Sequence, residues 1–267
     1  MRPRVFLTLA AVLLAGCADT EAPTTSDSTL PVSVAPGPDG PGSLPNGTLA
    51  PPSITLAACV HHEARFPLGA DALALVAPAG FAAAGDAAEL LVQARRCTLN
   101  DRTYNTMVAG IPVEAPAPYA ADGASHLLLV AGINTHSEVR DLWAAWGLAQ
   151  VAQKGDSAVF IPAPRPVPGV THSDAANENF SLDLYVTVSG TGGVAEETVR
   201  NLVAVDKAIV GIYDEALPAR TAQEGTAVVQ VAGAQGPPAP QQTNGDAIEY
   251  FEPFDVTMTY VPVPTSA

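Results

Sequence analysis

Three residues whose side chains could ligate a metal ion lie close together in the motif Cys59-Val60-His61-His62. Adjacent histidines point in opposite directions on an extended chain, and neither a CxxC nor an HExxH motif accompanies them. We therefore expect no metal site and no cofactor. Cys59 is better explained as one half of a disulfide.

The N-terminus has the composition of a bacterial lipoprotein signal. Met1-Arg2-Pro3-Arg4 is cationic, residues 5–14 are apolar but too few to span a bilayer, and Leu14-Ala15-Gly16-Cys17 follows. This order resembles a lipobox, in which Cys17 is acylated and becomes the first residue of the mature chain. We expect residues 1–16 to be a signal peptide and the protein to be lipid-anchored in the bacterial cell envelope. Ala18, directly after the cysteine, favours the outer membrane.

Residues 17–52 are predicted to be a tether between the lipid and a folded domain. Eight prolines lie between Ala18 and Pro52, and large apolar residues are rare there. Such a segment cannot offset the entropy lost on ordering. The folded domain is therefore expected to occupy residues 53–267.

Cys59 and Cys97 are the two cysteines that remain once Cys17 carries lipid. Export places them in a compartment where disulfides persist, so we expect them to pair. The bridge would close a loop of 38 residues (97 minus 59) and stabilise the fold by roughly 3–4 kcal/mol.

The charge of the chain is strongly acidic. Twenty-seven acidic and 12 basic residues give a formal net charge of −15 over 267 residues, and removing residues 1–16 with their two arginines leaves −17 (10 minus 27). A chain of this charge is repelled by a phosphate backbone, so we expect no nucleic-acid partner. Lysine is scarce, since only Lys154 and Lys207 are present.

The domain pattern is mainly that of antiparallel strands. Apolar runs of strand length are separated by Gly, Pro, Asn and Asp. The predicted strands occupy residues 73–76, 88–96, 104–113, 126–133, 158–162, 180–188, 204–213, 226–231 and 248–261.

One segment has clear helical spacing. Thr135-His136-Ser137-Glu138 has the spacing of a capping box, and Gly147 is suited to ending the helix. Between them, four apolar residues recur at helical intervals and share one face: Val139, Leu142, Trp143 and Trp146. A second, weaker helix is predicted over residues 196–203.

Several segments of the domain follow one another in a characteristic order. A proline-containing stretch at residues 72–81 precedes a strand ending in Ala94-Arg95-Arg96-Cys97, a strand at residues 104–113, and a strand ending in Asn134 before the tryptophan-bearing helix. In this order the chain resembles the acetoacetate decarboxylase family over about residues 73–162. The resemblance implies an α+β fold in which a curved, mainly antiparallel sheet or β-barrel with one or two helices encloses a mostly apolar cavity.

The residues that perform the chemistry of that family are missing. Its enzymes form a Schiff base between a β-keto acid and a lysine that follows the helix. Arg140 matches the family's helix arginine, but Gly147-Leu148-Ala149-Gln150 stands where Pro-Lys-Lys is expected, and no glutamate follows Tyr104. Lys207, on the predicted strand at residues 204–213, and Lys154, before a predicted turn, are the amines left for an imine.

We therefore predict a protein that binds a small apolar or carboxylate ligand in its barrel without Schiff-base chemistry. Two alternatives stay open: an active decarboxylase or aldolase-like enzyme that uses a relocated lysine, Lys207, and a purely structural envelope protein with a filled barrel. In the binding hypothesis, arginines pair with the ligand carboxylate and indoles form the apolar wall. The candidate ligand-binding residues are Arg96, Asn105, Arg140, Trp143 and Trp146.

Overall fold

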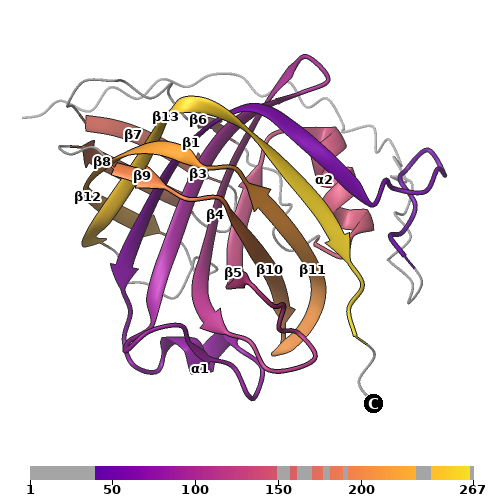
Figure 1. Cartoon of the computed structure of the whole chain (residues 1–267), viewed down its shortest axis with the longest axis horizontal. Coiled ribbons are helices and arrows are strands. Elements are labelled where there is room, and N and C mark those ends of the chain that lie inside the picture. Colours follow the sequence, from indigo (N-terminus) through magenta and orange to yellow (C-terminus); the bar gives the residue numbers. More distant parts are fainter. Residues whose placement is uncertain are drawn as a thin grey trace, which may run out of the picture. The chain divides into compact units, whose positions relative to one another are not determined.

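A computed structural model describes residues 40–148, 157–160, 170–176, 181–188, 192–232 and 242–264 (Figure 1). All of them belong to one compact unit, Pro31–Ala267. The predicted signal peptide, the lipidation residue Cys17 and the alternative lysine Lys154 lie outside the described residues.

Seven strands close into a barrel (Figure 1). Neighbouring strands pair in the order β1-β3-β4-β5-β10-β11-β13, and β13 pairs back onto β1. Every pair is antiparallel except β5 and β10, which run parallel. The strands are β1 (Ser53–Pro67), β3 (Glu89–Leu99), β4 (Arg102–Glu114), β5 (Ala124–Asn134), β10 (Glu197–Val205), β11 (Ala208–Leu217) and β13 (Gln242–Val261).

A second sheet extends from the barrel because β13 is 20 residues long and belongs to both. Its C-terminal part pairs with β11 and its N-terminal part with β12. The further strands of this sheet are β12 (Arg220–Ala232), β8 (Ser181–Val188), β7 (Val170–Ala176) and β6 (Ser157–Phe160). Two short strands complete the set: β2 (Ala82–Ala83) pairs with β4, and β9 (Gly192–Val194) pairs with β12.

The second sheet packs its apolar face against the outside of the barrel. Leu184 on β8 and Val229 on β12 are fully buried in one cluster with Val92 on β3 and Met107 on β4. The neighbouring strands β1 and β13 approach closely at Gly245, where a Cβ atom would lie 1.8 Å from the carbonyl oxygen of Arg65. Only glycine fits there, so a side chain at position 245 would force β13 away from β1.

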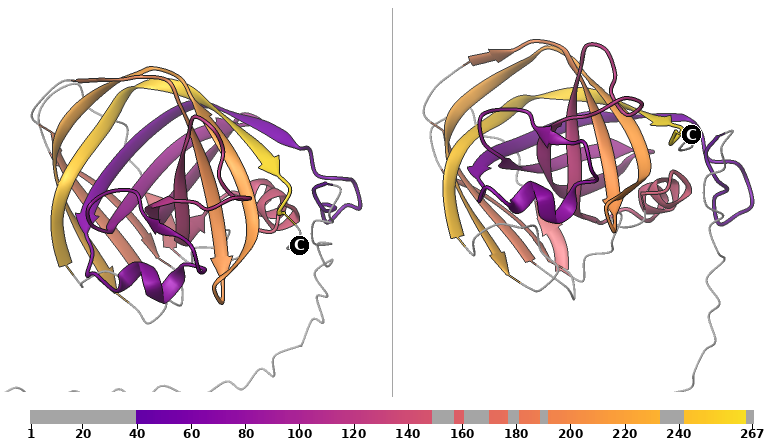
Figure 2. Two further views of the ribbon diagram at one scale, coloured as in Figure 1. Left: turned by 60° about the horizontal axis from the view of Figure 1, so that its bottom comes forward. Right: turned by 90° about the horizontal axis from the view of Figure 1, so that it is seen from below.

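Two helices lie within the described residues, α1 (Ala72–Val76) and α2 (Ser137–Ala145). α2 lies at one end of the barrel, beside β11 and the C-terminal end of β13 (Figure 2). The predicted stop at Gly147 is confirmed: Gly147 has φ +81°, and the N–H of Leu148 donates to the carbonyl of Trp143 at 2.8 Å. These features define a Schellman motif.

The predicted capping box does not form. The helix begins one residue later than that motif requires, with His136 as the N-cap. The hydroxyl of Thr135 donates instead to the carbonyl of Asn105, and the Glu138 carboxylate accepts from Arg102. Long-range partners therefore outcompete the local cap.

Two element predictions are wrong in type. Residues 73–76, predicted as a strand, form helix α1, because alternating Ala and Leu also suit a helix. Of residues 196–203, predicted as a helix, all but the first belong to strand β10. Val199, Leu202 and Val203 are buried there on both faces of the sheet, and a short run buried on both faces mimics helical spacing.

The folded structure includes part of the predicted tether. The N–H of Gly42 donates to the carbonyl of Ala145 at 2.7 Å, and the indole Nε1 of Trp146 donates to the carbonyl of Pro51 at 3.0 Å. Ala50 is only 3% exposed. Residues 40–52 thus pack against α2 before β1 begins.

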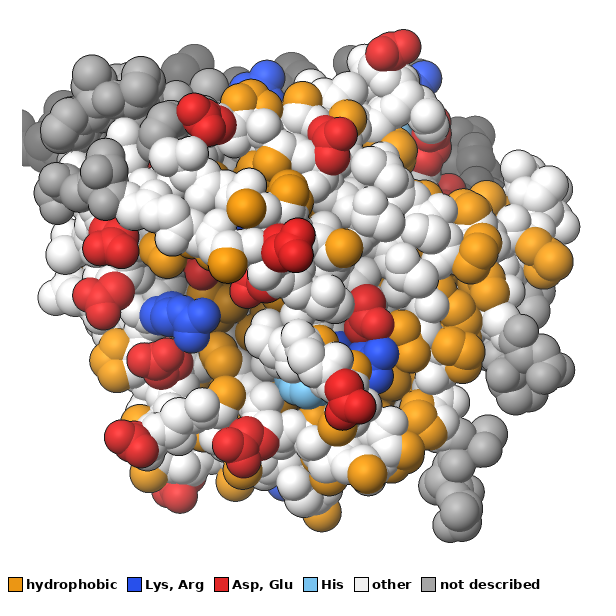
Figure 3. All heavy atoms as spheres, viewed as in Figure 1, with side chains coloured by type: hydrophobic (Ala, Val, Ile, Leu, Met, Phe, Trp, Pro, Cys, Tyr) orange, Lys and Arg blue, Asp and Glu red, His pale blue; other side chains and the backbone are white. Residues whose placement is uncertain are grey.

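Acidic side chains are scattered over the face shown in Figure 3, and basic ones are few. This distribution agrees with the formal net charge of −15. Among the described residues, no helix has the length and apolarity needed to cross a bilayer.

Candidate functional site in the barrel interior

A row of buried side chains crosses three neighbouring strands of the barrel wall. His61 on β1 pairs with Arg95 on β3 and with Tyr250 on β13. Directly paired residues project from the same face of a sheet. All three residues are at most 4% exposed. They therefore share one face, which the partner of Arg95 identifies as the barrel interior.

That partner is Glu215, on the opposite wall. The two guanidinium nitrogens of Arg95 donate to the two carboxylate oxygens of Glu215 at 2.8 and 3.0 Å, from β3 to β11. Burial alone would lower the pKa of Arg95, but the adjacent carboxylate outweighs it and the pKa is raised. This bidentate ion pair joins opposite walls of the barrel, and we call it the strut.

Aromatic rings surround the strut on the side of α2. The ring centroid of Trp143 lies 5.9 Å from that of Tyr213 and 6.5 Å from that of Tyr104, which it meets edge-on. Burial raises the pKa of both tyrosines, so their phenols stay neutral at physiological pH. The strut is therefore enclosed by apolar ring surface, which keeps water from solvating its charges.

Arg220 is a second buried cation. Its guanidinium carbon lies 4.5 Å above the ring of Tyr250 and 5.2 Å from that of Phe254, and Nη2 donates to Glu197 at 2.6 Å. The ring of His61 lies 5.2 Å from Tyr250. Burial, and then the charges of Arg95 and Arg220, lower the pKa of His61 well below its ordinary value, so the imidazole is neutral.

Several buried nitrogens of this region have no hydrogen-bond partner among the described residues. They are the donors Nε of Arg95, Nε and Nη1 of Arg220 and Nε1 of Trp143, and the two ring nitrogens of His61, of which one donates and one accepts in the neutral imidazole. The nearest carboxylate oxygen to His61, from Glu63, is 3.7 Å away and too far for a hydrogen bond. Buried polar groups are almost always satisfied, so this cluster is suited to a small polar guest or to ordered water. We call His61, Arg95, Glu215, Arg220 and Trp143 the interior cluster.

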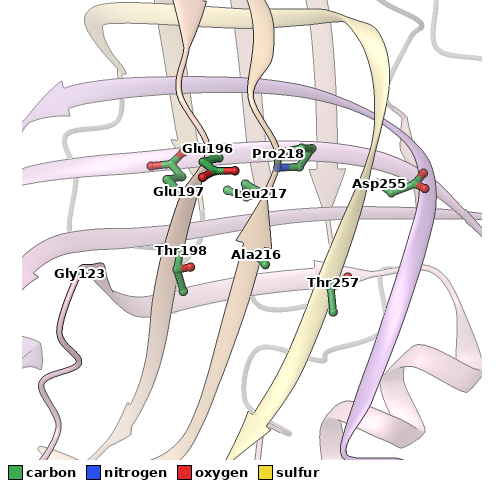
Figure 4. Close-up of a pocket in the computed structure, with 9 residues that line it drawn as sticks. All are labelled: Gly123, Glu196, Glu197, Thr198, Ala216, Leu217, Pro218, Asp255 and Thr257. Atoms are coloured by element: carbon green, nitrogen blue, oxygen red, sulfur yellow. The ribbon is translucent and has the colours of Figure 1, made fainter.

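An open pocket of about 570 Å³ adjoins the interior cluster at the ends of β10 and β11 (Figure 4). Glu196, Glu197, Leu217 and Asp255 are among its lining residues. Glu197 also accepts the hydrogen bond of the buried Arg220. This carboxylate therefore connects the solvent-exposed pocket to the interior.

The structure brings only part of the predicted ligand-binding set into the interior. Trp143 belongs to the interior cluster, and Trp146 is buried, but the N–H of the Trp146 indole is used by Pro51. The remaining three lie elsewhere. Arg96 is exposed, Arg140 is partly buried and donates to the carbonyl of Asn134, and Asn105 bonds through its backbone to Thr135.

The position of Arg96 has a simple geometric cause. Successive residues of a strand point to opposite faces, so with Arg95 inside the barrel its neighbour must point out. Sequence reasoning could not tell which of two adjacent arginines faces inward. Glu215 and Arg220 were missed altogether, since neither lies in a motif or near its partners in the sequence.

Lys207 does not lie on a strand facing a cavity, contrary to the prediction. It occupies the hairpin turn between β10 and β11 with φ +62°, next to Asp206 with φ +48°. Its Nζ donates to the carbonyl of Ala74 at 2.8 Å. No other lysine lies in the described part of the chain.

The predicted disulfide between Cys59 and Cys97 is confirmed. It joins β1 to β3 beside a register shift in β1, where Ala58 has φ +49°. The sulfur of Cys59 is thus not free for a metal. No cluster of three or more His, Cys, Asp or Glu residues suited to a metal ion occurs within the described ranges.

Comparison with known proteins supports the fold alone. No family model matches the sequence, and no curated protein is similar to it. One similar solved structure is an acetoacetate decarboxylase-like enzyme from Sphingomonas wittichii RW1, with a TM-score of 0.51, 12% identity and coverage of 82% of this chain and 96% of that one. Another is the enduracididine biosynthesis enzyme MppR complexed with pyruvate, with a TM-score of 0.51, 14% identity and coverage of 86% and 95%. The predicted fold class is therefore confirmed, and the chain has the acetoacetate decarboxylase-like fold.

Proposed function

We propose that this chain is an exported, lipid-anchored protein of the cell envelope whose barrel interior binds a small carboxylate or apolar ligand without forming an imine with it. The observation that carries the binding proposal is the set of buried donors without partners in the interior cluster. A barrel interior that served packing alone would not need four buried side chains with unpaired nitrogens.

The chemistry of those donors favours a carboxylate. Nε and Nη1 of Arg220 are unpaired N–H donors of one permanently charged guanidinium, and each can donate to an oxygen of an anionic ligand. Neutral His61 adds one further N–H, and the indole of Trp143 offers both ring surface and a donor. The similar protein MppR was crystallised with pyruvate, a small keto acid, which supports a ligand of this class.

The positions of the primary amines support the proposal that no imine forms. Lys207 lies in an exposed turn, bonded to Ala74, and the sequence has no lysine directly after α2. The other class of catalyst, one that reacts through a lysine of the interior, therefore lacks its nucleophile in the described part of the chain.

The Arg95–Glu215 strut favours a second candidate function. A strut between opposite walls stiffens the barrel and occupies its centre, as expected of a purely structural envelope protein. The two candidates differ in whether the unpaired donors of the interior cluster bind a ligand. A titration can distinguish them.

The test is a calorimetric and fluorescence titration of the chain from Ala18 onward with pyruvate, acetoacetate and butyrate. Trp143 lies on α2 and Trp146 is its C-cap, so a guest in the interior should change the emission of the two tryptophans of the chain. We expect saturable binding that Arg220→Gln weakens by about tenfold or more. Arg102→Gln, on the exposed rim, is the matched control and should bind like the parent chain.

Two outcomes would overturn the proposal. If none of the three acids binds while the chain is folded by circular dichroism, the structural candidate is favoured. If sodium borohydride with pyruvate yields a reduced adduct on Lys207 or Lys154, the chain is a Schiff-base enzyme. His61→Asn gives a second variant in case Arg220→Gln fails to fold.

Anchoring is tested separately. In a bacterial host, we expect the parent chain in the membrane fraction, with a lipid mass on Cys17, and Cys17→Ala in the soluble fraction of the envelope. A chain that stays membrane-bound without Cys17 would contradict the anchor.

A further inference from the structure

The outward face of the second sheet carries mainly polar side chains in regular rows. In β7, β8, β12 and β13, alternate residues such as Leu184 and Val229 are buried against the barrel, so the residues between them face solvent. Strand register aligns the outward residues in two central rows, His172-Tyr185-Val228-Asn244 and Asp174-Asp183-Gln230-Gln242. We call these eight residues the outer face.

A ring pair forms the centre of the outer face. The rings of His172 and Tyr185 are stacked with centroids 4.3 Å apart and an angle of 2° between their planes. Nε2 of His172 lies 3.0 Å from the carboxylate of Asp183, which holds the pair in place. A ring pair fixed in this way loses little conformational entropy when another surface stacks on it.

Hydrogen-bonding groups lie beside the rings. An open pocket of about 390 Å³ is lined by Ser181, Asp183, Gln230 and Gln242, among others, one row away from Tyr185. This volume falls within the range of about 300–1,000 Å³ typical of small-molecule sites. Its hydroxyl and amide groups both donate and accept, while the carboxylate only accepts.

The charges of the outer face select the partner. Its ionic side chains are Asp174 and Asp183, and neither Lys nor Arg occurs among its eight residues. A polyanion such as a nucleic acid or an acidic glycan would be repelled. A sugar without charge offers vicinal hydroxyls that match amides and carboxylates, and a C–H face that packs on aromatic rings.

We propose that the outer face binds an uncharged polysaccharide, with one sugar unit in the pocket beside Gln230 and Gln242 and the next over the His172–Tyr185 ring pair. The site is separate from the barrel interior and does not depend on its ligand. The proposal depends on the proposed function in one respect only: the protein must be located in the envelope to meet such a polymer.

Binding is tested by retention of the chain from Ala18 onward on insoluble cellulose and chitin, and by affinity electrophoresis in starch and laminarin. Alginate serves as the acidic comparison. We expect retention by at least one uncharged polymer and none by alginate. Tyr185→Ala and the double variant Gln230→Ala/Gln242→Ala should each lower the affinity by about tenfold or more.

Matched variants separate this site from the interior and from general effects on folding. Tyr185→Phe keeps the ring and should retain most of the affinity, and Thr103→Ala, at an exposed position on β4, should bind like the parent chain. Arg220→Gln should lose carboxylate binding but not polysaccharide binding, so the two proposals fail independently. Retention by alginate alone, no retention by any uncharged polymer, or unchanged binding by folded Tyr185→Ala would each overturn the proposal.

Discussion

The barrel interior and the outer face of the second sheet carry similar polar groups in opposite relation to water. Arg95 and Glu215 each have a side chain 5% exposed, whereas His172 and Asp183 have side chains 40% and 32% exposed. Both pairs have a contact of 3.0 Å or less. The geometry of a pair therefore says little about its contribution to folding until its burial is known.

The largest expected effect is in the interior. Glu215→Gln leaves the Arg95 charge buried without a counter-ion, so we expect the free energy of unfolding to fall by about 3–5 kcal/mol, measured by urea denaturation. Replacing both partners, as Arg95→Met with Glu215→Leu, should recover most of this loss. A loss below about 1 kcal/mol for Glu215→Gln would mean that water reaches the strut.

Removing the disulfide should have the next largest effect. The bridge closes a loop of 38 residues, for which chain entropy predicts a stabilisation of roughly 3–4 kcal/mol. We expect Cys59→Ser/Cys97→Ser to lose about this amount, and a reductant to weaken the parent chain but not the double variant. Equal stability of the parent chain with and without reductant would contradict the prediction.

The interior should also make stability depend on pH through His61. Its pKa is lower in the folded chain than in the unfolded chain, where it is about 6.5, so the unfolded state binds the proton first. Stability contributed by neutral His61 is fully present above pH 6.5 and is lost as the pH falls below it, with a slope of up to about 1.4 kcal/mol per pH unit. His61→Asn should flatten the curve between pH 6.5 and 5. Parallel curves for the parent and the variant would show that His61 is solvated.

The smallest effect is expected on the outer face. Asp183→Asn alters a partly exposed contact with His172 that water can replace, so the free energy of unfolding should change by less than about 1 kcal/mol in the same urea assay. A loss of 2 kcal/mol or more would mean that this pair contributes to stability as much as a buried pair does, and the two regions would then not differ.

Sequence patterns predicted the elements in which apolar residues recur at a clear spacing. α2 was found because Val139, Leu142, Trp143 and Trp146 form a continuous stripe that ends at a glycine. β1 was missed, although it has 15 residues, because it carries polar side chains on its buried face. His61 is fully buried in β1, and such a residue breaks the apolar alternation on which a strand prediction depends.

The candidate site was less predictable because it is formed by tertiary structure. Arg95 and Glu215 are 120 residues apart in the sequence, and nothing local marks either as the partner of the other. Lys207 was misplaced because Asp206-Lys207 makes a two-residue turn without the glycine that usually marks one. Side-chain direction in a strand and turns of unusual composition are fixed by the closed sheet, not by neighbouring residues.

The parallel pairing of β5 and β10 follows from the odd number of strands in the barrel. A ring in which every strand opposes both neighbours needs an even number of strands, so a ring of seven must contain one junction of like direction. Like-directed neighbours cannot be joined by a tight hairpin and require a long crossover connection. In this chain the crossover runs from residue 135 to residue 196, and it contains both α2 and strands β6, β7 and β8. The odd number of barrel strands thus requires a long connection, and that connection supplies both the tryptophan-bearing helix and most of the sheet that covers the barrel.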